Sequence, residues 1–486
     1  MNISKKRLLS LGLLWFGAMG TILGQIPIRG ELISDSLIAS YTLTEIADEY
    51  AAFGLPQFAA PIQYEIDAYK IVYWTLNAQG NGFTQASGAI MVPKMYPCDA
   101  TLVMYNHATV IYDEGLPSDL GEESIIGLPF ATAGYVVAMA DYLGLGESPG
   151  RHPFIHAKSE ATCGVDMLRA TKSLCANLSV PLNEQLFIGG YSQGAHVSMA
   201  QFEELETLHT SEFDVTGVAV GGGPYDLSGT MRQFFFSGTP SVTTSYYFAY
   251  MILAYQEVYG NLYNDLSEVF VAPYDTEIPL IFQRNGSQSG INLPAVATTM
   301  LQPSYVQAVQ ADPNHPFNIA LRDNDLYNWS PQSPLRMFYC EGDDVVPFAN
   351  SIIAKDSMLA NNAPNVDAIS VGVSNDHNSC ILPSFLQIKI FVDTRRENCS
   401  TAIDPSEAIG LTVAPNPFSD QLQINWQNAQ IKSVKLLSLA GQVLHEQAVG
   451  PVNTAIIKTP SLPSGLYLLA LEAEDRHYYQ KVVVQQ

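Results

Sequence analysis

The sequence predicts an α/β fold, with a mostly parallel sheet covered by helices on both faces, followed by a small all-β module. Short apolar runs alternate with helical patterns from about residue 101 to residue 392, and such alternation requires crossovers between parallel strands. The alternation stops over residues 231–329, which are rich in Phe and Tyr, and we interpret this segment as a helical cap inserted into the fold. Residues 411–486 consist of short alternating runs, which predicts an immunoglobulin-like sandwich.

These patterns divide the chain into parts. Residues 1–24 read as a secretory signal peptide, because a basic stretch at 5–7 precedes an apolar core at 8–18 and small residues lead to Gly24. We expect the main domain over 25–400, with the cap at about 230–330, a linker at 401–410 and the β module at 411–486. The apolar core of the leader is too short to span a bilayer, so we expect a secreted chain without a stable transmembrane anchor.

The composition indicates a folded and acidic protein. Hydrophobic residues make up 47% of the 486 residues, which is ample for large cores. The chain holds 47 acidic and 23 basic residues, and its net charge is −24. Because this charge repels phosphates, we expect no nucleic-acid partner.

The elements of the main domain follow one another in a regular order. An N-terminal arm at about 26–61 contains a helical stretch near 43–52, and residues 66–76 and 86–92 form a predicted hairpin. Buried strands are predicted at 101–105, 135–140, 186–188, 215–220, 335–339 and 368–373. Helices are predicted at about 122–133, at about 159–176 and directly after residue 194. A further helix follows residues 342–347 and ends at about 359, and the last is predicted at 383–392.

A Gly-x-Ser-x-Gly pattern, residues 190–194, directly follows the strand at 186–188. A serine at this position is presented on a sharp strand-to-helix turn, the arrangement called a nucleophile elbow. Ser148 has the same spacing in residues 146–150. We reject it because Pro149 has no N–H group to stabilise an oxyanion and disfavours a helical conformation of the residue before it. Ser192 is therefore the predicted nucleophile.

A serine hydroxyl needs a base to take its proton, and His377 is the predicted base. With this kind of elbow the nucleophile, the acid and the base follow one another along the chain. His107, His152 and His156 precede the serine, and His196 lies on the helix after it, where packing or hydrogen bonding is the commoner role. His377 directly follows an apolar strand. The other histidines lack such a strand or lie in the β module: His209, His315, His445 and His477.

The acid that orients the base should follow a strand between the elbow and His377. Asp343 and Asp344 both do so, and we prefer Asp343 for its distance from Val346 and Pro347. Asp344 is the second choice, and Glu341 is a more remote one.

The tetrahedral intermediate needs two N–H donors for its oxyanion. The backbone N–H of Gln193, at the start of the helix after the elbow, is the first predicted donor. The second should come from the loop after the strand at 101–105, which makes Ala108 or Thr109 the candidate.

Aromatic side chains are the candidates for an apolar substrate pocket. Beside the elbow these are Tyr191 and Tyr142, and in the cap they are Phe235 and Tyr247.

Six cysteines in an exported chain permit disulfides. Cys340 and Cys380 follow the acid and base strands closely, and we expect them to pair. Cys163 and Cys175 are about 18 Å apart if their helix is continuous, which prevents a bond between them. The chain has no C-x-x-C pair, and we expect no metal site and no cofactor, apart from an incidental cation that Asp323 and Asp325 could hold.

Several segments of the main domain resemble the secretory lipase group of α/β-hydrolases over roughly residues 43–392. They are residues 69–75 with 86–88, 106–109, 141–146, 190–194 and 324–334. The resemblance implies hydrolysis of carboxylic esters through an acyl-serine, with Ser192, Asp343 and His377 in the triad positions. Ala108 stands where relatives commonly have glycine, and some relatives carry peptidase labels, so amide cleavage remains an alternative.

The tail is similar to the type A C-terminal sorting domain of type IX secretion. The matching segments are residues 413–418, 439–443, 462–467 and 481–484. The resemblance implies the type IX machinery as a partner and export to the medium or the outer cell surface.

The predicted function is that of a secreted serine esterase or lipase acting on a small-molecule or lipid ester. A serine peptidase on the same fold and a catalytically inactive, surface-displayed binding protein are the alternatives.

Overall fold

The computed structural model describes residues 27–55, 61–284, 291–397 and 409–484, except 428, 438–442, 459–461, 464 and 474–476. The predicted signal peptide at 1–24 lies outside the described residues, as do positions 401–408 of the predicted linker.

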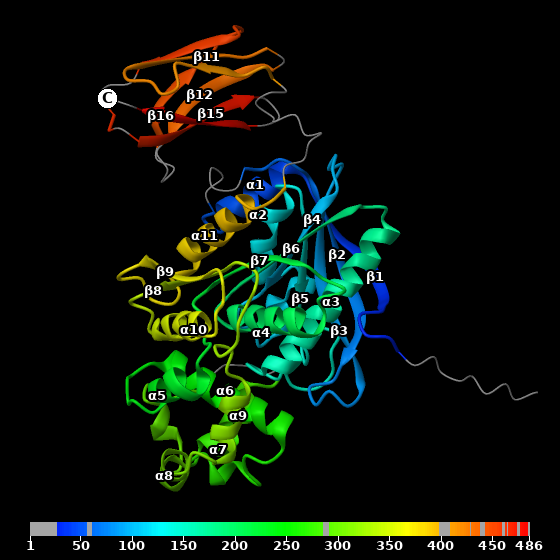
Figure 1. Ribbon diagram of the computed structural model, residues 1–486, viewed down its shortest axis with the longest axis vertical. Coiled ribbons are helices and arrows are strands. Elements are labelled where there is room, and N and C mark those ends of the chain that lie inside the picture. The colour runs from blue at the N-terminus through cyan, green and yellow to red at the C-terminus, as the bar shows by residue number, and fades with distance from the viewer. Residues whose placement is uncertain are drawn as a thin grey trace, which may run out of the picture.

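Within these ranges a sheet of nine strands forms the centre of the main domain, in the order β1-β2-β3-β5-β4-β6-β7-β8-β9 (Figure 1). Strands β1 to β3 pair antiparallel, and β3 joins β5 antiparallel. All pairings from β5 to β9 are parallel, so the predicted mostly parallel α/β fold is confirmed. The strands are β1 Leu32–Tyr41, β2 Ile66–Leu76, β3 Phe83–Pro93, β4 Ala100–Asn106, β5 Tyr135–Ala140, β6 Leu182–Tyr191, β7 Val215–Gly221, β8 Leu335–Cys340 and β9 Val366–Gly372.

Helices cover both faces of this sheet. In β4 every residue is buried, and alternate side chains enter two different cores: Leu102 and Met104 enter one, and Val103 and Tyr105 the other. The first core is closed by α3 Ala157–Asn177, α4 Gln193–Leu208 and α10 Ala349–Ala360. The second is closed by α1 Leu43–Ala52, α2 Leu128–Ala131 and α11 Ile381–Asp393. Burial on both faces explains why the central strands are continuous apolar runs in the sequence.

Two elements differ from the sequence prediction. Strand β1 lies in the segment expected to be an arm with one helix; its edge position leaves most of its side chains exposed, so it lacks an apolar pattern. The helix expected at about 122–133 is a 3-10 helix at Glu122–Gly127, followed by the short α2. Pro129 has no N–H group to donate within a longer α-helix.

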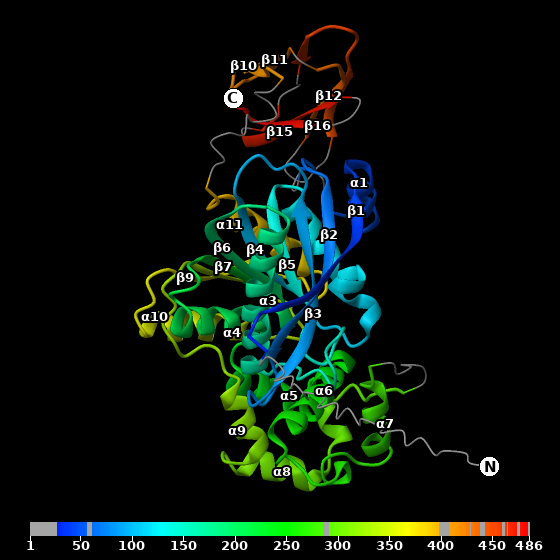
Figure 2. The same cartoon turned by 90° about the vertical axis from the view of Figure 1, so that its right-hand side faces the viewer.

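The cap lies between β7 and β8 and has its own hydrophobic core. Its helices are α5 Arg232–Phe235, α6 Val242–Tyr259, α7 Tyr274–Ile281, α8 Pro303–Ala311 and α9 Pro316–Asp323. They gather at one end of the main sheet (Figures 1 and 2). Helix α6 begins where the side chain of Ser241 accepts the Thr244 N–H, and it ends at Gly260, whose φ is 68°. Such caps satisfy the free backbone groups at both helix ends.

The C-terminal module consists, in its described part, of two antiparallel sheets around one core. One sheet has the order β10-β11-β14 and the other β13-β12-β15-β16. The buried Trp426 lies in the shared core with Leu422 from the first sheet and Leu469 from the second. This arrangement is the predicted β-sandwich. Its strands are β10 Thr412–Ala414, β11 Gln421–Asn425, β12 Ile431–Leu437, β13 Val443–Ala448, β14 Thr454–Lys458, β15 Gly465–Ala473 and β16 His477–Val484.

Each helix in the described part of the chain is too short or too polar to cross a lipid bilayer.

Candidate active site

Ser192 lies on a strained turn between β6 and α4. Its φ is 57°, a left-handed value that is costly for a residue other than glycine. The turn is held by the Ser192 N–H, which donates to Gly221 O at 2.9 Å. A Cβ atom on Gly190 would overlap Gly194 O, and one on Gly194 would overlap Asn106 O. Glycine at both positions is therefore required for the turn to close.

His377 lies in the loop between β9 and α11 and faces the serine. Its Nε2 is 2.8 Å from Ser192 Oγ, and its Nδ1 is 2.7 Å from Asp343 Oδ2. Tyr191 contacts this loop in two ways. Its hydroxyl donates to His377 O at 2.6 Å, and its ring packs against the imidazole. The three side chains proposed from the sequence thus form one continuous chain of contacts.

The loop after β8 distinguishes the three acid candidates. Asp343 Oδ1 accepts the N–H groups of Val345 and Val346, which leaves Oδ2 for His377. Asp344 instead accepts the backbone N–H of His377 at 3.2 Å. Glu341 is turned away and accepts a hydrogen bond from Ser370. Asp343 is the carboxylate that contacts the imidazole.

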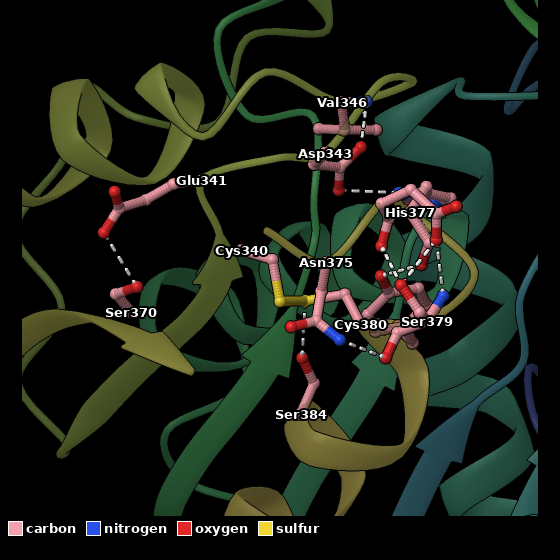
Figure 3. Close-up of a disulfide and its surroundings, with 12 residues drawn as sticks. Cys340, Glu341, Asp343, Val346, Ser370, Asn375, His377, Ser379, Cys380 and Ser384 are labelled. Carbon is pink, nitrogen blue, oxygen red and sulfur yellow. Dashed lines mark hydrogen bonds and ion pairs between the residues drawn. A yellow bond between two sulfur atoms is a disulfide. The ribbon is translucent and has the colours of Figure 1, made fainter. Parts of the chain in front are cut away.

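A disulfide joins the elements that carry the acid and the base (Figure 3). Cys340 ends β8, Cys380 directly precedes α11, and their Cα atoms are 6.0 Å apart. This bond is the one predicted from the sequence. Cys163 and Cys175 are buried on the continuous helix α3, and no disulfide joins them, as predicted.

The predicted oxyanion donors lie on two sides of Ser192. Gln193 is the first residue of α4, and the first N–H groups of a helix have no acceptor within it. The Ala108 N–H donates to Glu123 Oε2 at 3.0 Å, so in this conformation it is already occupied. Thr109 lines the same cavity as Ser192 and Gln193. Of the two residues proposed for the second donor, Thr109 is the one that lines this cavity.

A mostly apolar cavity adjoins Ser192. Phe235 and Tyr247, the two pocket residues predicted from the cap, line it. Tyr191 and Tyr142, the two pocket residues predicted beside the elbow, are not among the residues that line it. Tyr191 packs against His377, and Tyr142 stacks on His107 with ring centroids 4.0 Å apart while its hydroxyl donates to His107 O. Both rings support loops of the site instead of facing the substrate space.

A second histidine–carboxylate pair lies behind the elbow and was not predicted. His196 Nδ1 is 2.7 Å from Glu160 Oε2, and His196 Nε2 is 3.1 Å from the backbone oxygen of Asn324. Both neighbours are acceptors, so both ring nitrogens must donate and the imidazole is positively charged. Burial raises the pKa of Glu160, but the charge and hydrogen bond of His196 outweigh burial, and this pKa lies below its usual value.

The side chain of Gln193 links this pair to another histidine. Its Nε2 lies 3.0 Å from Glu160 Oε1 and 2.6 Å from His152 Nε2. His152 Nδ1 faces Leu143 O, so this ring is neutral, with Nε2 as an acceptor. Burial lowers the pKa of His152 to about 4, in agreement with a neutral ring. A sequence signal for this network is the placement of two polar residues on buried helices, Glu160 on α3 and His196 on α4.

The Ser148 hydroxyl has no hydrogen-bond partner among the described residues, unlike that of Ser192. Asp325 accepts hydrogen bonds from the backbone and side chain of Ser228. In the described part of the chain, no three His, Cys, Asp or Glu side chains form a group that could hold a metal ion.

Comparisons with known proteins found similarities for both parts of the chain. Residues 412–485 match the family model of the secretion system C-terminal sorting domain. The rice cell wall degrading esterase LipA from Xanthomonas oryzae is 27% identical, with a TM-score of 0.68 over 76% of this chain and 100% of that chain. Lipase A of Candida antarctica in its closed state, at 16% identity and a TM-score of 0.57 over 78% and 86% of the two chains, shows the same fold.

A secreted triacylglycerol lipase, LIP5 of Malassezia furfur, is 24% identical over 250 residues, which are 48% of this chain and 58% of the lipase. The chain spans less than two thirds of the length of the curated relatives it matches. The main domain therefore has an esterase- and lipase-like hydrolase fold. The sorting domain indicates export through type IX secretion to the cell surface or the medium, as predicted.

Proposed function

We propose that this protein is an exported serine hydrolase that cleaves carboxylic esters. The observation that carries the proposal is the chain of contacts from Ser192 Oγ through His377 to Asp343, with 2.8 Å and 2.7 Å between the heavy atoms. These are the distances and the order of roles that a serine nucleophile, its base and the orienting acid require. The similarity to the Xanthomonas esterase supports the same class of reaction.

In the first half of the reaction, Ser192 Oγ attacks the carbonyl carbon of the ester and its proton passes to His377 Nε2. The carbonyl electrons move to the oxygen, which the N–H groups of Gln193 and Thr109 stabilise. Asp343 stabilises the imidazolium that has formed. When the carbon–oxygen bond to the alcohol breaks, His377 returns the proton to the leaving alkoxide, and an acyl-serine remains.

In the second half, water attacks the acyl-serine while His377 takes the water proton. The tetrahedral intermediate collapses, the Ser192 oxygen leaves and recovers the proton from His377, and the carboxylic acid is released. The acid and base loops keep their relative positions throughout, because the disulfide between Cys340 and Cys380 joins the elements that carry them.

A fluorophosphonate probe and a p-nitrophenyl ester test the proposal. The wild type should be labelled and should turn over the ester, whereas Ser192→Ala should lose labelling and roughly 10³-fold or more of the turnover. Equal labelling of both proteins would contradict a serine mechanism. Faster hydrolysis of a peptide p-nitroanilide than of the ester would indicate the peptidase alternative, and the absence of both activities would indicate the binding protein.

A further inference from the structure

The cavity beside Ser192 is small, and residues of the cap form part of its wall. Its volume is about 40 Å³. Sites for drug-sized ligands have volumes of roughly 300–1,000 Å³, so a long acyl chain has no place here.

The walls of the cavity are apolar and come from the cap and from loops of the main domain. The cap contributes Met231, Phe235, Tyr247 and Met251, and the loop after Asp343 contributes Val345 and Val346. Because Asp343 accepts the N–H groups of both valines, the position of this wall is coupled to the position of the acid. An apolar lining next to the nucleophile suits the hydrocarbon part of an acyl group and not a polar alcohol.

The wall formed by α6 is held in place by specific contacts. The Tyr247 hydroxyl is hydrogen-bonded to the side chain of Thr109. Phe235 stacks on Phe248 at 4.6 Å between centroids, and Phe154, a lining residue, stacks on Tyr250 at 4.7 Å. These packed rings leave little freedom for the cavity to widen, because interiors at native packing density resist rearrangement.

On the other side of Thr109 and Tyr247 the molecule has a much larger and more open groove. Its volume is about 640 Å³, and these two residues line both spaces. Ser192 lines the small cavity and is not among the residues that line the groove. The small apolar cavity beside the nucleophile is therefore the space for the acyl group.

We propose that the enzyme is specific for esters with a short acyl group, of about two to four carbons, and that Met251 on α6 sets this limit. This inference rests on the proposed ester hydrolysis and names its substrate class. Removing the Met251 side chain beyond Cβ enlarges the cavity, because this side chain lines it. Longer acyl groups then fit, because each methylene accommodated in an apolar pocket changes kcat/KM by roughly tenfold or more.

The test is a series of p-nitrophenyl acetate, butyrate, octanoate and laurate with the wild type, Met251→Ala and Leu253→Ala. Leu253 lies on the same helix and in the same core but does not line the cavity, and its change to alanine removes the same number of non-hydrogen atoms. Wild-type kcat/KM should fall by about 100-fold from butyrate to octanoate. Met251→Ala should raise the octanoate-to-acetate ratio by about tenfold, and Leu253→Ala should leave it within about threefold.

The outcomes separate this inference from the proposed function. Wild-type preference for octanoate or laurate would overturn the short-acyl inference while leaving serine ester hydrolysis intact. Equal effects of the two variants on the ratio would overturn the role of Met251. Absence of turnover with every ester, together with absence of fluorophosphonate labelling, would overturn the proposed function itself. If Met251→Ala does not fold, the wild-type series alone decides the chain-length limit.

Discussion

The molecule has two histidine–carboxylate pairs with the same geometry, one that contacts Ser192 and one between α3 and α4. In both, Nδ1 of the imidazole is 2.7 Å from a carboxylate oxygen: the front pair is His377 with Asp343, and the rear pair is His196 with Glu160. What differs is the partner of Nε2. His377 Nε2 faces the Ser192 hydroxyl, whereas His196 Nε2 faces the backbone oxygen of Asn324. A carbonyl oxygen has no proton to give, so the rear pair cannot act as a base.

The difference shows that a carboxylate beside an imidazole is not enough to identify a catalytic dyad. The front pair leaves Nε2 free to accept a proton from Ser192. In the rear pair both imidazole nitrogens donate to acceptors, so the ring keeps its proton. These contacts connect α3, α4 and the end of α9. We therefore expect the front pair to determine the rate and the rear pair to determine stability.

The largest effect is expected from Asp343→Asn. The amide oxygen can still accept the N–H groups of Val345 and Val346, but the amide no longer holds the imidazole in the tautomer that accepts the Ser192 proton, and kcat should fall by about 10⁴-fold. Ester turnover measures the rate, and thermal unfolding serves as the control, with a midpoint close to that of the wild type. A loss below about tenfold would mean that the front pair is not the catalytic one.

The second effect is expected from Glu160→Gln, which leaves the buried imidazolium of His196 without its counter-charge. The free energy of unfolding should fall by about 3–5 kcal/mol, as measured by urea unfolding, whereas ester kcat of the folded protein should stay within about tenfold of the wild-type value.

The double variant Glu160→Gln/His196→Gln is the matched control, because it removes both charges. The free energy of unfolding should fall less in the double variant than the sum of the decreases in the single variants Glu160→Gln and His196→Gln, by about 1 kcal/mol or more. Additive losses would show that the two side chains are energetically independent.

The smallest effect concerns pH. Burial lowers the pKa of His152 and of His156 to about 4, while an unfolded histidine titrates near 6.5. Between these values the unfolded chain binds more protons than the folded one, so the free energy of unfolding falls as the pH falls. His152 alone should contribute about 2–3 kcal/mol of this loss between pH 6.5 and pH 4.5.

Urea unfolding at pH 7.5 and pH 4.5 measures this dependence, with His152→Gln as the comparison. The variant should lose less stability than the wild type over this interval. The Glu160 carboxyl lowers the stability further at still lower pH. Its pKa in the folded protein is below its usual value of about 4.5. The stability that it contributes is therefore present above about pH 4.5 and is lost as the pH falls through the pKa of the folded protein. Equal pH dependence of the two proteins would show that His152 is not buried as a neutral ring.

Much of the fold follows from local patterns in the sequence. The Gly-x-Ser-x-Gly turn after an apolar run specifies a backbone conformation within a few residues, and the structure shows that turn at Ser192. The sequence also determined the alternation of strands and helices, the sandwich and its sorting-domain pattern, and the pairing of Cys340 with Cys380. These features depend on residue types and spacing, which the chain carries by itself.

Tertiary structure alone decided the contacts between side chains that are distant in the sequence. It brought Asp343 and not Asp344 to the imidazole, gave the Ala108 N–H to Glu123, and directed the hydroxyls of Tyr191 and Tyr142 to the backbone oxygens of His377 and His107. It also assembled the pair of Glu160 and His196 and set the size of the cavity beneath α6. The physical reason is that the side chains of neighbouring residues in a loop or strand point in different directions. Only the packing of the whole domain decides which of them faces a given atom.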